Sequence, residues 1–176
     1  MKKFKFIVTI LTLSFFSVHV LAHGPSRQKV SEKIVINASP QKVWSIVSNF
    51  KQFDWNNNIK STIADNNQVG SERTLEFTNG SLVKQKLEKT DKEKMMVSWR
   101  IVETDNKVLP VNSYSAKIFI RNNDDGSSSV NYKAGFYRGF MGNDPPEELN
   151  DQNSKKKVQE FIQDSLKGLK KVAEKN

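Results

Sequence analysis

The stretch that decides the fold is IVINASPQKVWSIVSNFKQFDWN, residues 34 to 56. It continues a strand-like segment from Val30 to Ile36, in which β-branched residues alternate with polar ones. Ser39 is suited to cap a helix, and Pro40 is suited to its first turn. The apolar residues that follow fall at helical spacing: Val43, Trp44, Val47 and Phe50. The stretch therefore predicts a first strand followed by two short helices.

Strand-like segments dominate the middle of the chain. Asn79-Gly80 is a strong tight-turn signal and joins the first two of them, and NNDDGSS, residues 122 to 128, predicts another hairpin loop. The five predicted strands are Arg73 to Thr78, Ser81 to Lys89, Met95 to Glu103, Ser113 to Arg121 and Ser128 to Tyr137. Because hairpins link them, we expect an antiparallel sheet.

A long amphipathic helix is predicted from about Asp151 to Lys175. Its apolar stripe consists of Val158, Phe161, Ile162, Ser165, Leu169 and Val172. One strand, a short helix pair, a run of antiparallel strands and this helix make an α+β arrangement. We expect the sheet to curve around the C-terminal helix in a single domain that spans residues 23–176.

The first 22 residues have the pattern of a secretory signal peptide. Lys2, Lys3 and Lys5 precede an apolar run from Phe6 to Val20, and cleavage is expected after Ala22. The run is too short for a membrane span, and no second apolar segment follows. We therefore expect an exported, periplasmic protein without a membrane span in the mature chain. Export also excludes nucleic acid as a partner.

The residues that are missing exclude several kinds of chemistry. The chain has no cysteine, which excludes disulfides, thiolate catalysis and covalent haem attachment. Of two histidines, only His23 stays in the mature chain. A terminal amine and an imidazole can hold copper, but there is no second histidine and Pro25 follows closely. We expect a frayed terminus, no metal and no cofactor.

Alternation along the predicted strands identifies the inner face of the sheet. This face is mostly apolar, yet Arg73, Gln85 and two tyrosines share its parity. A plain core is the simpler interpretation, and a cavity with an apolar wall and a few directing groups is the alternative. The candidate cavity residues are Arg73, Phe77, Gln85, Trp99, Tyr114, Tyr132, Phe136 and Phe161.

Residues 34 to 56 resemble the opening signature of the SRPBCC superfamily, the helix-grip fold of START, Bet v 1-like and polyketide cyclase-like proteins. Four further segments resemble the MxaD family of periplasmic methanol-oxidation proteins: AHGPSRQKV, RTLEFTNG, LPVNSYSAKI and FYRGFMGNDPPEELND. Together they cover almost all of the mature chain. One departure is that this family places His-Pro after the tryptophan where Trp55 here precedes three asparagines. No ligand role is therefore carried over to that loop.

The segment FYRGFMGNDPPEELND, residues 136 to 151, must lead from the end of the sheet to the last helix. A structural connector explains its Gly and Pro residues. Aromatic and Met side chains clustered there also suit a contact surface. The candidate partner contacts are Tyr137, Arg138, Phe140 and Met141.

Three classes of function are compatible with these patterns. The MxaD resemblance implies an accessory protein that assists methanol dehydrogenase and its c-type cytochrome by contact. The wider superfamily implies a carrier of a small lipophilic or aromatic ligand. An enzyme is disfavoured, because the inward side chains include Arg73, Tyr114, Tyr132 and Glu103 but no histidine and no carboxylate pair.

Basic residues fall on the outward parity of successive strands. They are Lys84, Lys86, Arg100, Lys117 and Lys133. The mature chain keeps 25 basic and 19 acidic residues, because the first 22 contain three lysines and no acid. Such a pattern is typical of a solvated face, and the net charge of +6 also favours acidic partners.

Overall fold

The computed structural model describes residues 24–175. The predicted signal sequence, its predicted cleavage site and His23 lie outside the described residues. The elements in chain order are β1 (Gln28–Ile36), α1 (Pro40–Val47), β2 (Ile59–Ala64), β3 (Glu72–Phe77), β4 (Leu82–Asp91), β5 (Met96–Thr104), β6 (Val111–Asn122), β7 (Ser128–Arg138), a 3-10 turn η1 (Glu147–Leu149) and α2 (Asp151–Ala173).

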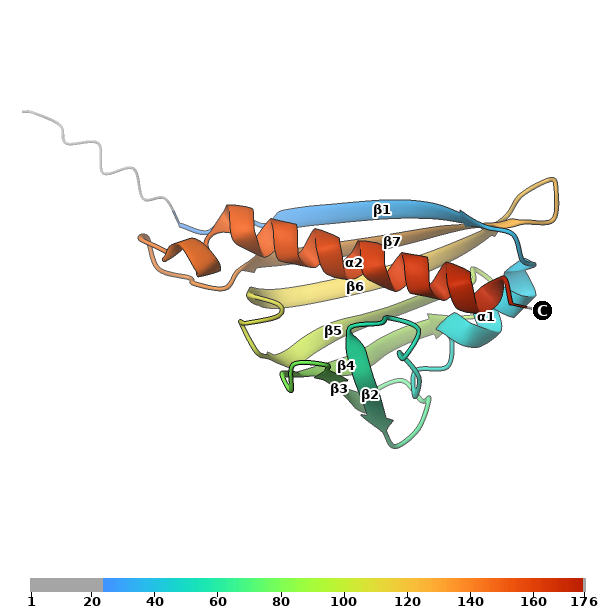
Figure 1. Cartoon of the computed structure of the whole chain (residues 1–176), viewed down its shortest axis with the longest axis horizontal. Coiled ribbons are helices and arrows are strands. Elements are labelled where there is room, and N and C mark those ends of the chain that lie inside the picture. Colours follow the sequence, from blue (N-terminus) through green and yellow to red (C-terminus); the bar gives the residue numbers. More distant parts are fainter. Residues whose placement is uncertain (1–23, 176) are drawn as a thin grey trace, which may run out of the picture.

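The strands form one seven-stranded sheet in the order β1-β7-β6-β5-β4-β3-β2. Every neighbouring pair is antiparallel. In Figure 1, α2 lies lengthwise over the sheet beside β1, and α1 lies near its C-terminal end. The helix contacts β1 and β7, while α1 contacts β6 and α2. The curved sheet with a long helix across it confirms the predicted α+β helix-grip class.

Local chemistry explains where these elements begin and turn. The Ser39 hydroxyl accepts a hydrogen bond from the Lys42 amide at 3.3 Å, and Pro40 opens α1. Gly80 has φ of +85° in the turn between β3 and β4, a conformation that glycine adopts at little cost. At the start of α2, the Asn150 side chain accepts from the Asn153 amide at 2.8 Å.

Two predictions about elements were wrong. After α1, residues 48–58 form turns in place of a second short helix, with amides bonding three residues back, as from Gln52 to Asn49 and from Asn56 to Phe53. Strand β2 was not predicted. It is an edge strand with polar residues on both faces and Ile63 68% exposed, so its sequence lacks a clean alternation.

The stripe of α2 was predicted correctly except at its end. Val158, Phe161, Ile162, Ser165 and Leu169 are buried, whereas Val172 is exposed and Ala173 is buried in its place. The buried stripe therefore shifts by one residue at the end of the helix.

A close approach fixes α2 against the turns that follow α1. A Cβ atom placed on Gly168 would lie 1.7 Å from the carbonyl oxygen of Trp55. Beside it, the buried Asn56 side chain donates a hydrogen bond to the Ser165 hydroxyl at 2.8 Å. The turns of residues 48–58 are thereby held against the helix, which positions Phe50 and Phe53 over the inner face of the sheet.

Candidate functional site

The centre of the grip holds a buried arginine. Arg73 lies on β3 and shares the inward parity of Leu75 and Phe77, and only 2% of it is exposed. Burial lowers the pKa of the Arg73 guanidinium to about 9 because desolvation disfavours the charged form. The group is still protonated at neutral pH, so the interior of the protein contains a positive charge.

Three aromatic rings surround this guanidinium. Its central carbon lies 4.1 Å from the ring centroid of Phe50, 4.4 Å from that of Phe53 and 5.3 Å from that of Trp99. Phe50 and Phe53 come from the turns after α1, and Trp99 comes from β5. The faces of aromatic rings attract cations, so this aromatic cage offsets part of the desolvation cost.

Hydrogen bonding at Arg73 is incomplete. Nε donates to the Gln85 side-chain oxygen at 2.9 Å, and Nη1 donates to the Phe50 carbonyl at 3.3 Å. Within residues 24–175 no carboxylate pairs with it, and Nη2 has no acceptor. The Gln85 amide nitrogen and the Trp99 indole nitrogen are also buried without an acceptor. The cluster therefore has more donors than acceptors.

Two tyrosine hydroxyls complete this polar centre. The Tyr114 and Tyr132 oxygens lie 3.4 Å apart, and the Tyr132 ring meets the Trp99 ring edge to face at 5.4 Å. Burial raises the pKa of both phenols, and the nearby positive charge of Arg73 opposes that rise in part. Both hydroxyls are neutral at pH 7 and able to donate to an anion.

A hollow of about 250 Å³ opens beside this centre, between α2 and the turn that joins β3 to β4. Its apolar walls are Phe77 and Phe161, whose rings lie 6.0 Å apart, and its rim is polar. Phe161 stacks on Phe53 at 5.8 Å, and Phe53 covers Arg73. A layer of two phenyl rings thus separates the hollow from the guanidinium.

All eight candidate cavity residues are buried on the inner face or on α2. Arg73, Gln85, Trp99, Tyr114 and Tyr132 form the polar centre; Tyr114 also packs on Phe136 at 6.2 Å, and Phe77 and Phe161 line the hollow. Sequence reasoning missed the roles of Phe50 and Phe53 in the cage. Helical spacing predicted that Phe50 is part of a core, but no sequence pattern indicated that its ring contacts the Arg73 guanidinium.

The loop after β7 presents two of the four predicted contact residues. Phe140 is 39% exposed and Met141 is 48% exposed, and Tyr137 is half-buried. Arg138 was wrongly predicted to be available to a partner. Its side chain is buried and donates to the carbonyls of Phe140 and Gly142 and to the Asp151 carboxylate at 2.6 to 2.8 Å. It shapes the loop from within.

Comparison with known families agrees with this geometry. Residues 27–174 match the family described as polyketide cyclase / dehydrase and lipid transport. The chain belongs to this family. The family description indicates a ligand-binding protein of the SRPBCC type. A comparison with the curated proteins gives no match.

Solved structures share the fold. The protein XoxI from Bacillus cereus is 21% identical with a TM-score of 0.67, and the match covers 84% of this chain and 95% of that one. A protein from Nitrosospira multiformis is 19% identical with a TM-score of 0.66, over 83% and 96% of the two chains. Truncated norcoclaurine synthase from Thalictrum flavum is 13% identical with a TM-score of 0.63, over 87% and 97%. At these identities the likeness concerns the fold alone.

Among the described residues, no group of three or more His, Asp or Glu side chains is placed to hold a metal ion. Likewise, none of the helices described is long and apolar enough to cross a membrane.

Proposed function

We propose that the protein is a non-catalytic carrier that binds a small, mainly apolar ligand with an anionic oxygen group, such as a carboxylate, inside the grip. The observation that carries this proposal is the caged Arg73, a buried positive charge without a carboxylate partner among the described residues. The description of the family, which includes lipid transport, supports a role in ligand binding.

The chemistry of the cluster favours an anion over a neutral group. Arg73 Nη2, Gln85 Nε2 and Trp99 Nε1 are three donors that need an acceptor, and a buried unpaired donor costs about 1 to 3 kcal/mol. A carboxylate has two oxygens and accepts charge-assisted bonds from a guanidinium. One ligand group would therefore satisfy several donors and neutralise the buried charge at once.

The apolar part of the ligand has a place along the hollow. Phe77, Phe161 and Phe53 form a continuous aromatic wall from the rim toward Arg73. Entry of an anionic head requires the Phe53 and Phe161 rings to part, and Phe53 lies on the short turns rather than on a strand or helix. An elongated ligand would then place its head at Arg73 and its tail at the rim.

Binding can be tested by tryptophan fluorescence, because Trp99 lies at the centre. We expect 2-naphthoate to bind the purified mature protein at least about tenfold more tightly than 2-naphthylmethanol, which lacks the charge. Arg73→Met should abolish this preference. The matched control is Arg100→Met, which removes an exposed arginine from the outer face.

Equal affinities of the wild-type protein for the two probes would contradict the proposal, as would an unchanged preference in Arg73→Met. Absence of binding by both probes would also contradict it, provided that a wild-type melt shows a folded protein.

A second candidate function is that of a periplasmic accessory protein in methanol oxidation, which assists contact or electron transfer between methanol dehydrogenase and its c-type cytochrome. It is supported by the MxaD resemblance of the segment 136 to 151 and by the exposure of Phe140 and Met141 in that segment. Export through the predicted signal peptide is part of this proposal. The two candidates use different parts of the molecule and need not exclude each other.

A further inference from the structure

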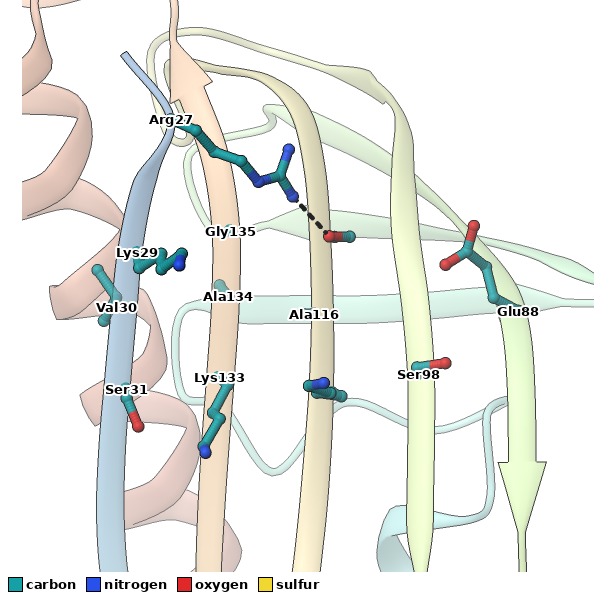
Figure 2. A pocket seen from close by; sticks show the side chains of 12 residues that line it. Arg27, Lys29, Val30, Ser31, Glu88, Ser98, Ala116, Lys133, Ala134 and Gly135 are labelled. Atoms are coloured by element: carbon teal, nitrogen blue, oxygen red, sulfur yellow. Dashed lines mark hydrogen bonds between the residues drawn. The ribbon is translucent and has the colours of Figure 1, made fainter.

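The face of the sheet turned away from α2 carries a recessed, basic surface, which we call the outer trough. It consists of two hollows of about 610 and 290 Å³ that share Lys133. Figure 2 shows the larger hollow, with the side chains projecting from β1, β7, β6, β5 and β4 while α2 lies behind the sheet. The trough is separate from the interior site around Arg73.

Strand register explains why this face is recessed. Lys29 lies opposite Gly135, which in turn lies opposite Ser115, so two small residues follow one another across β7 and β6. The next row runs from Ser31 through Lys133 and Lys117 to Ser98. Gly135 and Ser115 thus form a low floor, and Lys133 and Lys117 rise beside it on the next row, between Ser31 and Ser98.

Arg27 closes one end of the floor. Its Nη2 donates to the Ser115 hydroxyl at 3.2 Å, and its guanidinium lies 5.7 Å from the Tyr137 ring centroid. A Cβ atom on Gly135 would come within 2.9 Å of Nη2, so the absence of a side chain at residue 135 leaves room for the arginine. These contacts place the guanidinium over the floor of the trough.

The charges of the trough are almost all of one sign. Six basic residues line it: Arg27, Lys29, Lys33, Lys117, Arg121 and Lys133. None of the six forms an ion pair with any residue the structure describes. Glu88 is the acidic residue of the lining, and it pairs with Arg100 at 3.5 Å. The trough therefore presents an uncompensated positive potential.

The outward lysines nearer the other edge of the sheet differ. Lys84 pairs with Glu103 at 3.6 Å, Lys60 with Glu76 at 2.7 Å and Lys89 with Asp91 at 3.2 Å. The sequence pattern had grouped Lys84 and Arg100 with Lys117 and Lys133, but acidic neighbours compensate the first two. Lys86 on β4, the fifth member of that group, has no ion pair with a described residue, but the unpaired basic residues of the trough lie on β7 and β6 and on or next to β1.

We infer that the outer trough docks an acidic segment of a protein partner. Carboxylate side chains that project from such a segment fit a recess in which serine hydroxyl groups lie beside ammonium groups. A flat bilayer surface would meet the lysines before it meets Ser98 and Ser115, whereas a protein segment can project side chains into the recess. A protein segment therefore satisfies both the shape and the charge of the trough.

The experiment uses a fluorescein-labelled glutamate-rich peptide and the mature protein, with binding measured by anisotropy at low salt. Lys117→Ser with Lys133→Ser should weaken binding by about tenfold or more, because both lysines flank the floor. The matched control, Lys155→Ser with Lys156→Ser, removes the same charge from exposed positions on α2 and should change affinity by less than about twofold. Wild-type affinity should also fall steeply when salt rises to about 0.3 M.

Thermal melts of both double variants establish that they are folded, since all four lysines lie outside the core. Equal weakening in both variants would overturn the inference, because the peptide would then report net charge alone. So would binding to vesicles that contain phosphatidylglycerol without binding to the peptide, which would assign the face to a membrane. Absence of peptide binding at low salt would overturn it as well.

Discussion

Two features of the Arg73 guanidinium have opposite effects on stability. The three aromatic rings around it are stabilising, whereas its incomplete set of hydrogen-bond acceptors is destabilising. Contacts with three rings contribute about 0.5 to 2 kcal/mol each. Removing a charge from water costs several kcal/mol, and no carboxylate within residues 24–175 offsets it. A buried charge with a lowered pKa and an incomplete set of acceptors is typical of a functional site.

We therefore predict that Arg73→Met leaves the free energy of unfolding unchanged or raises it by up to about 2 kcal/mol, because methionine fills similar volume without a charge. Urea unfolding of the ligand-free protein measures this change. Arg100→Met serves as the exposed control and should have little effect. A loss of more than about 2 kcal/mol in Arg73→Met would show that the cage stabilises the fold, and would weaken the case for a binding site.

Trp99 should behave differently from Arg73. It is 2% exposed and packs against Tyr132, Phe53 and Arg73, so truncation leaves a large space at the centre of the grip. We predict that Trp99→Ala lowers the free energy of unfolding by about 3 to 5 kcal/mol. Trp44→Ala, at a half-buried position on α1, should lower it by much less in the same urea titration. A small loss for Trp99→Ala would indicate an open cavity around the indole.

The sequence predicts which residues belong to the site but not how they are arranged. Alternation placed Arg73, Gln85, Trp99, Tyr114 and Tyr132 on the inner face, and all five are buried there. Alternation reports only which face a side chain occupies. The distances between strands far apart in the sequence, and the approach of Phe53 from a turn, depend on how the sheet curves, which no local pattern describes.

At the scale of elements, α2 depends on a backbone contact rather than on helix propensity. Gly168 lies in the helix interior, where alanine would ordinarily be favoured by about 1 kcal/mol. Here a Cβ atom would overlap the Trp55 carbonyl, and a backbone group cannot rotate away as a side chain can. The turns of residues 48–58 would have to shift.

We predict that Gly168→Ala lowers the free energy of unfolding by about 1 to 3 kcal/mol, against the sign expected from propensity. Lys167→Ala is the matched control, because it changes an exposed neighbour on the same helix and should have an effect within about 0.5 kcal/mol. Chemical denaturation followed by circular dichroism gives both values. A Gly168→Ala protein more stable than the wild type would mean that α2 and the turns separate easily.

The elements that were hard to predict share a physical cause. Strong alternation and the Asn79-Gly80 turn predicted β3 to β7, each within a few residues of its bounds. By contrast, β2 at the edge and the turns of residues 48–58 are ordered by tertiary contacts, such as the Asn56 bond to Ser165 and the packing of Trp55 on Gly168. A segment whose conformation depends on contacts with distant residues has no clear periodicity or turn signal in its own sequence.

At the scale of the whole molecule, three separate regions have proposed functions. The interior around Arg73 is proposed for an anionic ligand, and the outer trough for an acidic segment. The loop after β7 presents Phe140 and Met141 to solvent, and the trough begins beside it, because Arg27 packs on Tyr137 three residues before Phe140. A partner that contacts the loop can therefore also contact the trough.

Arg138 gives this loop a defined shape. Its guanidinium bonds two loop carbonyls and the Asp151 carboxylate at the start of α2, so the exposed pair is presented on a fixed support. We predict that Arg138→Met lowers the free energy of unfolding by about 1 to 3 kcal/mol and speeds proteolytic cleavage within residues 139 to 146. Limited proteolysis followed by mass spectrometry locates the cut. Arg121→Met, at an exposed position on β6, should leave both properties unchanged.

The methanol-oxidation proposal predicts a specific role for the exposed pair. Apolar anchors dominate contact energies, whereas basic residues mainly accelerate association. We predict that Phe140→Ser with Met141→Ser leaves the melting temperature almost unchanged, because both side chains are exposed, yet slows methanol-linked reduction of the cytochrome in a reconstituted periplasmic extract by several-fold. The matched control is Ile63→Ser with Leu82→Ser, which removes two exposed apolar residues from β2 and β4. If the loop variant and the wild type support equal rates while their melts agree, the loop is a connector only. If both double variants slow the reaction equally, apolar exposure in general is responsible. A loss confined to the loop variant would locate the contact with the partner at Phe140 and Met141.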